Sequence, residues 1–344
     1  MDFELSDDQQ ALQDAAADLL ASLASSERVR AAIADEVVGY DTALWKAMLE
    51  QGWLGIDVSE ARGGLGLGMV EVAVLLEQSG RANAPVPLLE NVLALGAFTR
   101  ALDAGIGEAE EWVERLLSGD AIACVALVPG PAPYAPCADV AVVPAGDALV
   151  AIPLADRRPP REPAMDLTRP LGWLEVDGGG ALPLGGADAV GAFVDRGAVA
   201  YAAEMLGGAA RVMDLSVEYA KERVQFGRPI GSFQAVKHRC ADMLVDVEGM
   251  RSSVYWAAWC IGAGHEDASV AASTAKVWCS DASRRVMASA LQVHGGIGFT
   301  WEHDVHLFLK RAQLDQMRFG DAAFHRDRLV DLLRARVEAG ASLL

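Results

Sequence analysis

The stretch ERVQFGRPIGSFQ, residues 222–234, lies between two segments with the apolar spacing of long helices. One apolar stripe precedes it, at Leu206, Ala209, Met213, Val217 and Ala220, and another follows it, at Val236, Cys240, Met243, Val247 and Met250. Inside the stretch, two glycines and a proline interrupt the helical pattern. The sequence therefore predicts a helix ending near Arg223, a turn at Gly227-Arg228-Pro229, and a new helix beginning at Gln234.

The side chains that this turn presents are suited to binding. Arg223 supplies a planar cation, Gln225 and Gln234 supply amides, and Phe226 supplies a ring. Together they suit a ligand that carries an anionic group and a planar group. Taken alone, the stretch is equally typical of an ordinary connection between helices.

A second stretch, QVHGGIGF at residues 292–299, has a comparable composition. Gln292 precedes Gly295 and Gly296, and paired glycines allow a backbone to approach a ligand closely. Either stretch alone is also compatible with a plain interhelical turn, but the two together indicate a binding site.

The remainder of the chain divides into three zones. Residues 1–118 are predicted to be helical, beginning with a capping box formed by Ser6 and Gln9. Residues 119–194 are predicted to be a β domain, because short apolar runs (AIACVALV, ADVAVV, ALVAIP and GWLEV) alternate with Pro, Gly and Asp clusters. DAVGAFV, residues 188–194, is predicted to be its last strand. Residues 195–344 are predicted to be a C-terminal helical bundle.

Composition excludes several classes of function. The formal net charge of −19 argues against nucleic acid as a partner. Five widely spaced cysteines without a CxxC pattern indicate a reducing compartment rather than a disulfide framework. No basic and apolar leader stands at the N-terminus, and no apolar run approaches the ~18 residues of a membrane span. We therefore expect a cytoplasmic protein without a membrane span.

Two further motifs are interpreted as structural. The glycines of GGLGLG do not follow a predicted strand and do not keep the register of a dinucleotide-binding loop, so a turn between helices is expected. Glu302, His303 and His306 lack the spacing of a metal site and a third partner, so no metal is expected there.

The motifs together resemble the acyl-CoA dehydrogenase family. ERVQFGRPIGSFQAVKHRCADM (222–243) and QVHGGIGFTWEHDVHLFLKRA (292–312) resemble its C-terminal helical domain. DFELSDDQQALQDAA (2–16) and GWLGIDVSEARGGLGLGMVEVAVLLEQSGRANAPVPL (52–88) resemble its N-terminal helical domain. The resemblance covers nearly the whole chain. It implies a mainly α fold with a central, shortened β domain and a C-terminal four-helix bundle.

The resemblance also implies a cofactor and a reaction. In the family, FAD is bound where two subunits meet, and the C-terminal domain of one subunit holds the adenosine diphosphate half of its neighbour's FAD. The residues that match this donated half are Arg223, Gln225, Phe226, Phe233, Gln234, Gln292, Val293, His294, Gly295 and Gly296. The implied reaction is α,β-dehydrogenation of an acyl-CoA thioester, with an electron-transfer protein reoxidising the flavin.

The chain departs from the family where the chemistry takes place. Most members place a catalytic glutamate before a Gly-Thr, where this chain has Phe319, and a minority place it where this chain has Gly197. The flavin-side signature of the β domain is missing from residues 119–187. The arginine that commonly meets the CoA moiety matches Ala198, with Arg196 close by. The nearest spare carboxylates are Asp321, expected to lie at a helix terminus, and Glu204, expected to be partly buried within a helix.

Three interpretations follow from this pattern. The first is a non-catalytic subunit that completes the FAD site of a second acyl-CoA dehydrogenase subunit, in an α2β2 heterotetramer acting on a bulky or steroid acyl-CoA. The second is a self-sufficient homodimer or homotetramer that uses an atypical base such as Asp321 or Glu204. The third is a structural relic that binds neither flavin nor thioester.

Overall fold

The N-terminal part of the chain folds into helices, as predicted. A computed structural model describes residues 4–35, 37–175 and 180–340. Met1–Phe3, in the predicted N-terminal helical zone, and Val176, in the predicted strand GWLEV, lie outside the described residues. The capping box is confirmed: the Gln9 amide donates to Ser6 Oγ at 3.3 Å, and the Ser6 amide donates to Gln9 Oε1 at 3.0 Å. The helices are α1 (Asp7–Leu23), α2 (Ser26–Ala34), α3 (Thr42–Glu50), α4 (Met69–Arg81), α5 (Leu88–Asp103) and α6 (Glu110–Ser118). Three short 3₁₀ turns connect them, η1 (Trp53–Gly55), η2 (Glu60–Arg62) and η3 (Gly107–Ala109).

The middle part of the chain contains the predicted strands. A four-stranded sheet has the order β1-β3-β4-β6, in which only the β1–β3 pair is parallel. A smaller antiparallel pair joins β2 to β5. The strands are β1 (Ala123–Val125), β2 (Gly130–Pro133), β3 (Val140–Ala145), β4 (Ala148–Pro153), β5 (Leu171–Leu174) and β6 (Leu182–Gly185), with the 3₁₀ turn η4 (Ala135–Cys137) after β2.

The four-stranded sheet is buried on both faces. Along β3, Val140 and Val142 belong to the large core shared with the helices, whereas Ala141 and Val143 belong to a second, smaller core. This alternation follows the two-residue period of a strand. It explains why the run VAVV, residues 140–143, is apolar without interruption.

The prediction of a strand at residues 188–194 is wrong. These residues form the beginning of α7 (Ala187–Glu222), a helix of 36 residues. Val190, Phe193 and Val194 are spaced as i, i+3 and i+4, which is the spacing of one helix face. The division of the chain at residues 118 and 194 stays a prediction.

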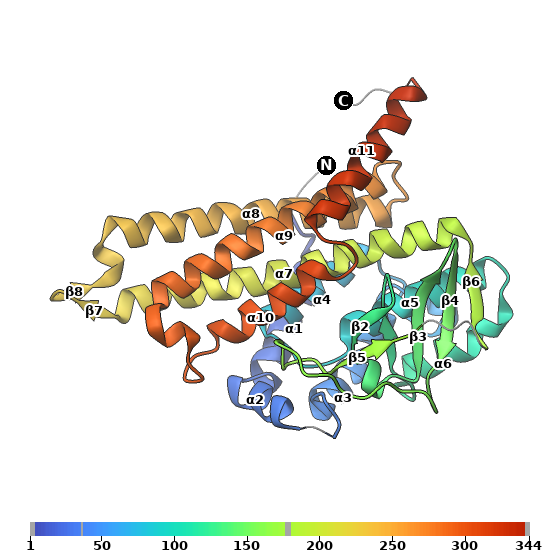
Figure 1. Cartoon of the computed structure of the whole chain (residues 1–344), viewed down its shortest axis with the longest axis horizontal. Helices are drawn as coiled ribbons and strands as arrows, with labels where there is room; N and C mark the ends of the chain where they lie inside the picture. The colour runs from blue at the N-terminus through green and yellow to red at the C-terminus, as the bar shows by residue number, and fades with distance from the viewer. Residues whose placement is uncertain (1–3, 36, 176–179, 341–344) are drawn as a thin grey trace.

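The C-terminal part is a bundle of long helices. In Figure 1, α7, α8 and α9 run side by side, and α10 crosses below them, while α11 extends away from the body. The remaining elements are α8 (Gln234–Gly262), α9 (Ala268–His294), α10 (Val305–Met317) and α11 (Ala322–Glu338), with 3₁₀ turns η5 (Ile230–Ser232) and η6 (Gly295–Phe299) and the two-residue strands β7 (Val224–Gln225) and β8 (Arg228–Pro229). Within the described parts of the chain, no helix is long and apolar enough to cross a membrane.

Helix α7 sets the distance between the two ends of the molecule. It begins next to β6 and ends at the β7–β8 hairpin, so the sheet and the hairpin lie at opposite ends in Figure 1. With a rise of about 1.5 Å per residue, its 36 residues span about 54 Å. The turn quoted at the outset is therefore remote from the chain's own β strands.

Candidate functional site

The stretch 222–234 forms a tight hairpin at the tip of the bundle. Helix α7 ends at Glu222, and Arg223 is its C-cap, with extended backbone dihedrals. The Arg223 backbone amide donates a hydrogen bond to the Tyr219 carbonyl at 2.9 Å. Phe226 and Gly227 both have positive φ, +54° and +77°, as the two central residues of a type I′ hairpin turn require. Helix α8 then begins at Gln234, as the sequence predicted.

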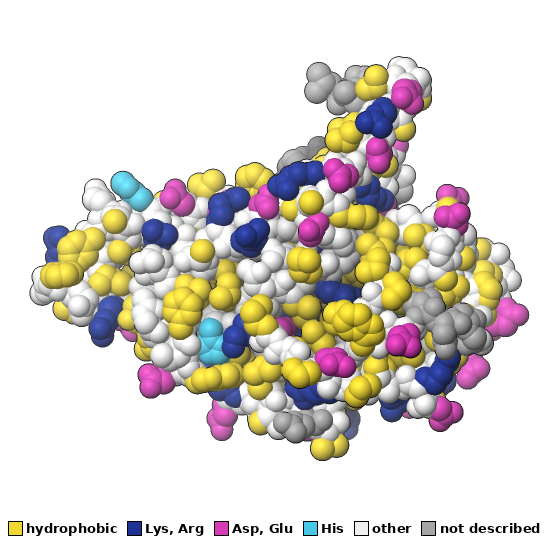
Figure 2. Space-filling view, in the orientation of Figure 1, with side chains coloured by type: hydrophobic (Ala, Val, Ile, Leu, Met, Phe, Trp, Pro, Cys, Tyr) yellow, Lys and Arg dark blue, Asp and Glu magenta, His cyan; other side chains and the backbone are white. Residues whose placement is uncertain are grey.

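The side chains of this hairpin face solvent. Phe226 is 93% exposed, and Arg223, Gln225 and Gln234 are exposed as well, while Phe233 is half-buried. Figure 2 shows hydrophobic and Lys or Arg side chains together at this left-hand end of the molecule. The Arg228 guanidinium lies 4.2 Å from the centre of the Phe233 ring, and Phe226 meets the same ring edge-on at 6.1 Å. These contacts hold the hairpin without using Arg223.

Arg223 is the side chain that an anion could engage. Among the described residues, its guanidinium makes no hydrogen bond and no ion pair. Gln225 Nε2 donates only to the neighbouring Val224 carbonyl, at 2.8 Å. A diphosphate brought to this surface would therefore find an unpaired guanidinium.

The second predicted stretch lies at the same end of the bundle. Helix α9 ends at His294 and is capped by Gly295, whose φ is +63°. The His294 ring stacks on Tyr219 with 4.7 Å between centroids, and Tyr219 lies one helical turn before Arg223. The structure thus brings the ends of α7 and α9 together through Tyr219, a residue that sequence reasoning did not select.

Within this second stretch, the residues have two different roles. Val293 and His294 are buried, and His294 Nδ1 lies 2.8 Å from the Ala290 carbonyl oxygen. Burial lowers the pKa of His294, so the ring is neutral near pH 7 and supports the turn rather than offering a charge. Gln292, Gly295 and Gly296 are exposed.

The glycines of this turn are not required by the chain's own packing. A Cβ added to Gly295 or Gly296 would meet no atom within 4 Å, and Gly296 does not have positive φ. At Gly296 the absence of a side chain therefore leaves space on the outer surface, where a ligand or a neighbouring subunit could approach the backbone.

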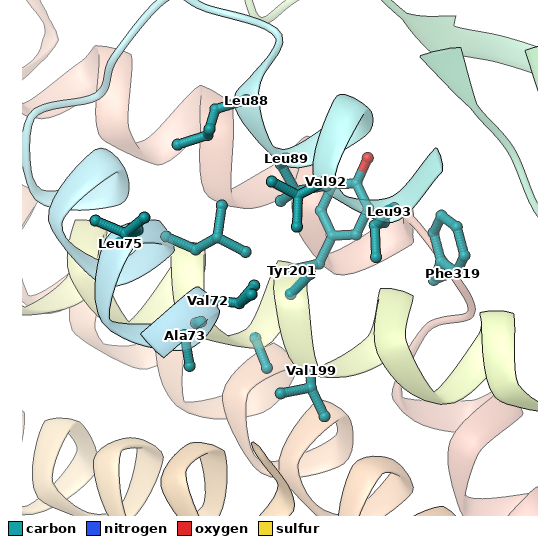
Figure 3. Packing of buried hydrophobic residues seen from close by; sticks show 14 of the residues in the cluster. Val72, Ala73, Leu75, Leu88, Leu89, Val92, Leu93, Val199, Tyr201 and Phe319 are labelled. Carbon is teal, nitrogen blue, oxygen red and sulfur yellow. The ribbon is translucent and has the colours of Figure 1, made fainter. Parts of the chain in front are cut away.

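The two positions that hold the catalytic glutamate in the resembling family lie against one another. Phe319, with φ of +52°, is 1% exposed, and its ring covers Gly197 on α7. Figure 3 shows this ring above α7, beside Tyr201. Phe193 and Tyr201 contact the Phe319 ring with centroid distances of 4.9 and 5.6 Å. The space between the two positions is filled by apolar side chains.

Buried bases hold the turn that carries Phe319. Lys276 Nζ donates to the Gln316 carbonyl at 3.0 Å and to the Gly320 carbonyl at 2.7 Å, and His325 Nε2 lies 2.8 Å from the Phe319 carbonyl. Burial lowers the pKa of Lys276 to about 7 and that of His325 to about 4. This support could not be predicted from the sequence, because Lys276 is 40 and 44 residues away from the carbonyl groups that it binds.

The two weak candidates for a catalytic base have structural partners. Asp321 is the N-cap of α11 and accepts a hydrogen bond from the Phe324 amide at 2.9 Å, which confirms that it lies at a helix terminus. Glu204, expected to be partly buried, is 2% exposed and is bonded by Arg169 through one oxygen and by Arg311, at 3.2 Å, through the other. Both carboxylates already have hydrogen-bond or ion-pair partners within the chain.

The arginine nearest to the family's CoA-binding position is also occupied. Ala198 is buried, and Arg196 Nη2 pairs with Asp57 Oδ2 at 2.6 Å.

The two motifs that were interpreted as structural form turns. Gly63 and Gly66, in the GGLGLG loop, adopt positive φ between η2 and α4. His303 accepts the Val305 amide at the start of α10, at 3.3 Å. Within the part of the chain that the structure describes, no group of three or more metal-ligating side chains is present.

Comparison with known proteins identifies the family. The model described as "Acyl-CoA dehydrogenase, N-terminal domain" matches residues 6–120, and "Acyl-CoA dehydrogenase, C-terminal domain" matches residues 185–333. The acyl-CoA dehydrogenase IpdE2 of Mycolicibacterium smegmatis is 38% identical over 309 residues, which cover 90% of this chain and 93% of the relative. The chain belongs to the acyl-CoA dehydrogenase family. Acyl-CoA dehydrogenases are oxidoreductases. Two further structures of the same fold, at 22% sequence identity, are described as "PigA with FAD and proline" and "FAD complex of PigA".

Two solved structures share this fold with 28% sequence identity. One is described as "Tcur3481-Tcur3483 steroid ACAD G363A variant", with a TM-score of 0.86 over 96% of this chain and 99% of that chain. The other is the ChsE4–ChsE5 complex from Mycobacterium tuberculosis, with a TM-score of 0.85 over 97% of this chain and 99% of that chain. The acyl-CoA dehydrogenase fold predicted from the sequence is confirmed.

Proposed function

We propose that this chain is the non-catalytic subunit of a heteromeric, FAD-dependent acyl-CoA dehydrogenase. Two observations carry the proposal: the separation of the two halves of the expected flavin site supports sharing with another subunit, and the lack of a carboxylate at Gly197 and Phe319 supports a non-catalytic role. The exposed residues that match the diphosphate half lie at one end of α7, about 54 Å of helix away from the chain's own sheet. A single FAD cannot reach both ends, so the hairpin would serve the flavin of another subunit.

The residues at the base positions support the same conclusion. Gly197 has no side chain, and Phe319 is apolar and fills the space above it. General-base chemistry requires a proton acceptor within reach of the substrate carbon. A partner subunit would therefore supply the base, the acyl pocket and the flavin-ring site.

The similar proteins supply a precedent for this assembly. The two solved structures are named as pairs of different proteins, and one of them is called a steroid enzyme. We extend this to the present chain as an α2β2 heterotetramer that acts on a bulky acyl-CoA.

The contribution of this chain to the reaction is binding and orientation. A bound FAD would supply the acceptor for the β-hydride of an acyl-CoA thioester, the partner would supply the base for the α-proton, and an electron-transfer protein would be the electron acceptor. Arg223 would pair with the diphosphate, and the exposed backbone at Gly295 and Gly296 would pack against the same group. Phe226 and Phe233 would flank the adenosine, while Gln225, Gln234 and Gln292 would supply hydrogen bonds.

The exposed apolar side chains of the bundle offer an area for the partner to cover. Leu244 and Val245 on α8 are 48% and 69% exposed, and Phe324 and Val330 on α11 are 42% and 53% exposed. Both helices pack against α9, and exposed apolar side chains of this kind could be covered by a partner subunit.

Flavin content tests the proposal. The chain is purified alone and after co-expression with a candidate dehydrogenase subunit, and flavin absorbance and acyl-CoA-dependent dye reduction are measured. We expect colourless, inactive protein alone and yellow, active complex after co-expression. A yellow, active single chain would instead support a self-sufficient enzyme using Asp321 or Glu204, and a colourless complex would support a structural relic.

Arg223→Ala in the co-expressed complex tests the assignment of the half-site. Loss of a charge-assisted contact to a diphosphate should reduce FAD affinity by about tenfold or more. Arg100→Ala is the matched control, because Arg100 is an exposed arginine on α5. Equal FAD content in the two variants would show that Arg223 does not bind the flavin.

A further inference from the structure

An exposed apolar surface lies at the sheet end of the molecule, away from the hairpin. Pro131 on β2 and Trp173 on β5 are register partners, and both are exposed. Directly opposed residues of an antiparallel pair present their side chains on the same face. Since Trp173 is 56% exposed, this two-stranded sheet has an apolar outer face.

The end of α10 extends this surface. The Arg318 guanidinium donates to the Pro131 carbonyl at 2.6 Å and to the Val125 carbonyl at 2.8 Å, so it ties α10 to β1 and β2. Met317, the residue before Arg318, is 62% exposed, and Val128, between β1 and β2, is 65% exposed. Figure 2 shows hydrophobic side chains on the face that carries β2 and β5 in Figure 1. We call these four exposed residues the sheet-end patch: Val128, Pro131, Trp173 and Met317.

The sheet-end patch borders the turn that carries Phe319. Met317 precedes Phe319 by two residues, and the Phe319 ring covers Gly197. The patch is therefore next to the two positions at which family members keep a base. Because apolar side chains of the chain itself fill these positions, a segment that arrives from outside would meet a closed protein surface.

The composition of the patch suits a protein partner. Large apolar side chains gathered on one surface mark a contact site, and tryptophan is enriched at the centre of interfaces. A two-stranded sheet is only marginally stable by itself, so a cover over β2 and β5 would also stabilise this sheet.

The symmetry of the proposed assembly selects the segment that covers the patch. In the proposed complex, the hairpin 222–234 of this chain reaches the flavin site of a partner with the same fold. Two subunits of one fold that meet about an approximate twofold axis exchange equivalent surfaces. The hairpin of the partner would then arrive at the corresponding place on this chain, which is the sheet end beside Phe319 and Gly197.

We infer that the sheet-end patch receives the hairpin of the partner subunit, with Trp173 at the centre of the contact. The inference rests on the proposed function, because it requires a dehydrogenase subunit of the same fold as the partner. On this side of the assembly the hairpin meets protein, so the patch contributes to assembly rather than to the binding of FAD.

Photochemical cross-linking in the co-expressed complex tests the identity of the segment on the patch. The probe p-benzoylphenylalanine replaces Trp173, the complex is irradiated, and the products are mapped by mass spectrometry. We expect a cross-link to the partner segment that aligns with residues 222–234 of this chain. The same probe in place of Leu67, which is 48% exposed in the loop before α4, should not give this product. A cross-link from position 173 to a second copy of this chain or to another partner segment, or no cross-link, would overturn the inference.

Substitutions measure the strength of the contact. Trp173→Glu should raise the dissociation constant between the subunits about thirtyfold or more, as expected for a residue at the centre of an interface. Met317→Lys should raise it about tenfold, whereas Leu67→Glu should leave it unchanged. Sedimentation of the diluted complex gives the dissociation constants, and circular dichroism of each isolated variant confirms that it folds. Assembly of Trp173→Glu as tight as that of wild type would contradict the inference.

Two measurements separate this inference from the proposed function. FAD content of the complex reports the proposed function, and the dissociation constant between the subunits reports the patch. At concentrations at which the Trp173→Glu complex is still assembled, its FAD content should equal that of wild type, whereas Arg223→Ala lowers FAD content. A wild-type pair that does not assemble or holds no FAD would overturn both. An assembled, FAD-containing pair that is insensitive to Trp173→Glu would overturn only the role of the patch.

Discussion

Phe319 and Gly197 fit against each other so closely that neither position can change independently. A Cβ built on Gly197 would lie 1.9 Å from Cδ1 of the Phe319 ring. Since real Cβ atoms do not approach other heavy atoms so closely, the glycine is required by the ring above it. The two positions at which family members keep a base are thus joined into one packed contact.

Gly197→Ala should therefore destabilise the fold although alanine favours helix. We expect the free energy of unfolding to fall by about 1–3 kcal/mol, the usual cost of overpacking a core. Gly191→Ala is the control on the same helix, because an added Cβ there meets no atom within 4 Å. That variant should gain about 0.5–1 kcal/mol from helix propensity. Urea denaturation of the two variants checks the result, and equal stabilities would disprove the contact.

Phe319→Ala should remove the steric conflict and leave a cavity. The loss of a buried ring costs about 3–5 kcal/mol, and Gly197→Ala added to that variant should then cost less than it does alone. A double-mutant cycle from urea denaturation measures this coupling. Additive costs would show that the two residues act separately.

Local patterns were sufficient to predict most of the elements. The hairpin at 222–234 and the helix beginning at Gln234 follow from residues that can be read within one stretch. The error at residues 188–194 came from treating an apolar run as a strand when Val190, Phe193 and Val194 also fit one face of a helix. Short apolar runs do not distinguish the two structures, and here the rest of α7 extends the helix through them.

The buried polar contacts could not be predicted in the same way. Arg169 bonds Glu204, 35 residues away, and Asp315, 146 residues away, at 2.8 Å in the second case. Only the packing of the strand region on α7 and α10 brings these charges together. Neighbouring residues in the sequence carry no information about such partners, and the same holds for the carbonyl partners of Lys276.

Arg169→Met should be strongly destabilising. Arg169 and its partners Glu204 and Asp315 are only 1–2% exposed, so the substitution leaves the buried Asp315 carboxylate without its cation and leaves Glu204 with Arg311 alone. Removing one partner of such a buried group costs about 3–5 kcal/mol. Lys221→Met breaks a surface pair with Glu218, in which both side chains are 63% exposed, and should cost less than about 1 kcal/mol. Chemical denaturation measures the free energy of unfolding of both variants. Similar losses would show that the buried ion pairs of Arg169 contribute no more to stability than the surface pair of Lys221.

Lys276 should make stability depend on pH. Burial lowers its pKa in the folded state to about 7 from the ordinary 10.5, despite the nearby Asp315, Cys279 and Asp321. Between these values the unfolded chain binds a proton that the folded chain does not, so the contribution of Lys276 makes stability rise with pH from about 7 to about 10.5. Below about pH 7 both states bind the proton, and this contribution no longer changes with pH. Within this range, Lys276 adds up to about 1.4 kcal/mol to the free energy of unfolding for each pH unit.

Lys276→Met removes this proton from both states. The difference in unfolding free energy between wild type and Lys276→Met should therefore grow in favour of wild type as pH rises from about 7 to about 9. Exposed Lys237 provides the control, because Lys237→Met should shift the stability curve without changing its slope. Parallel curves for wild type and Lys276→Met would show that the buried ammonium is not the titrating group.

Gly296→Ala separates folding from cofactor binding. An added Cβ at Gly296 meets no atom of this chain within 4 Å, and its φ is not positive, so the isolated subunit should keep its unfolding free energy within about 0.5 kcal/mol. In the co-expressed complex, the same methyl group would stand where the diphosphate approaches the backbone. FAD affinity should then fall by about tenfold, the loss of about one hydrogen bond to a charged group. Gly107→Ala, at an equally open position in η3, should alter neither property. Flavin fluorescence on dilution of the complex reports the affinity, and unchanged FAD retention in Gly296→Ala would mean that the turn after α9 faces something other than the flavin.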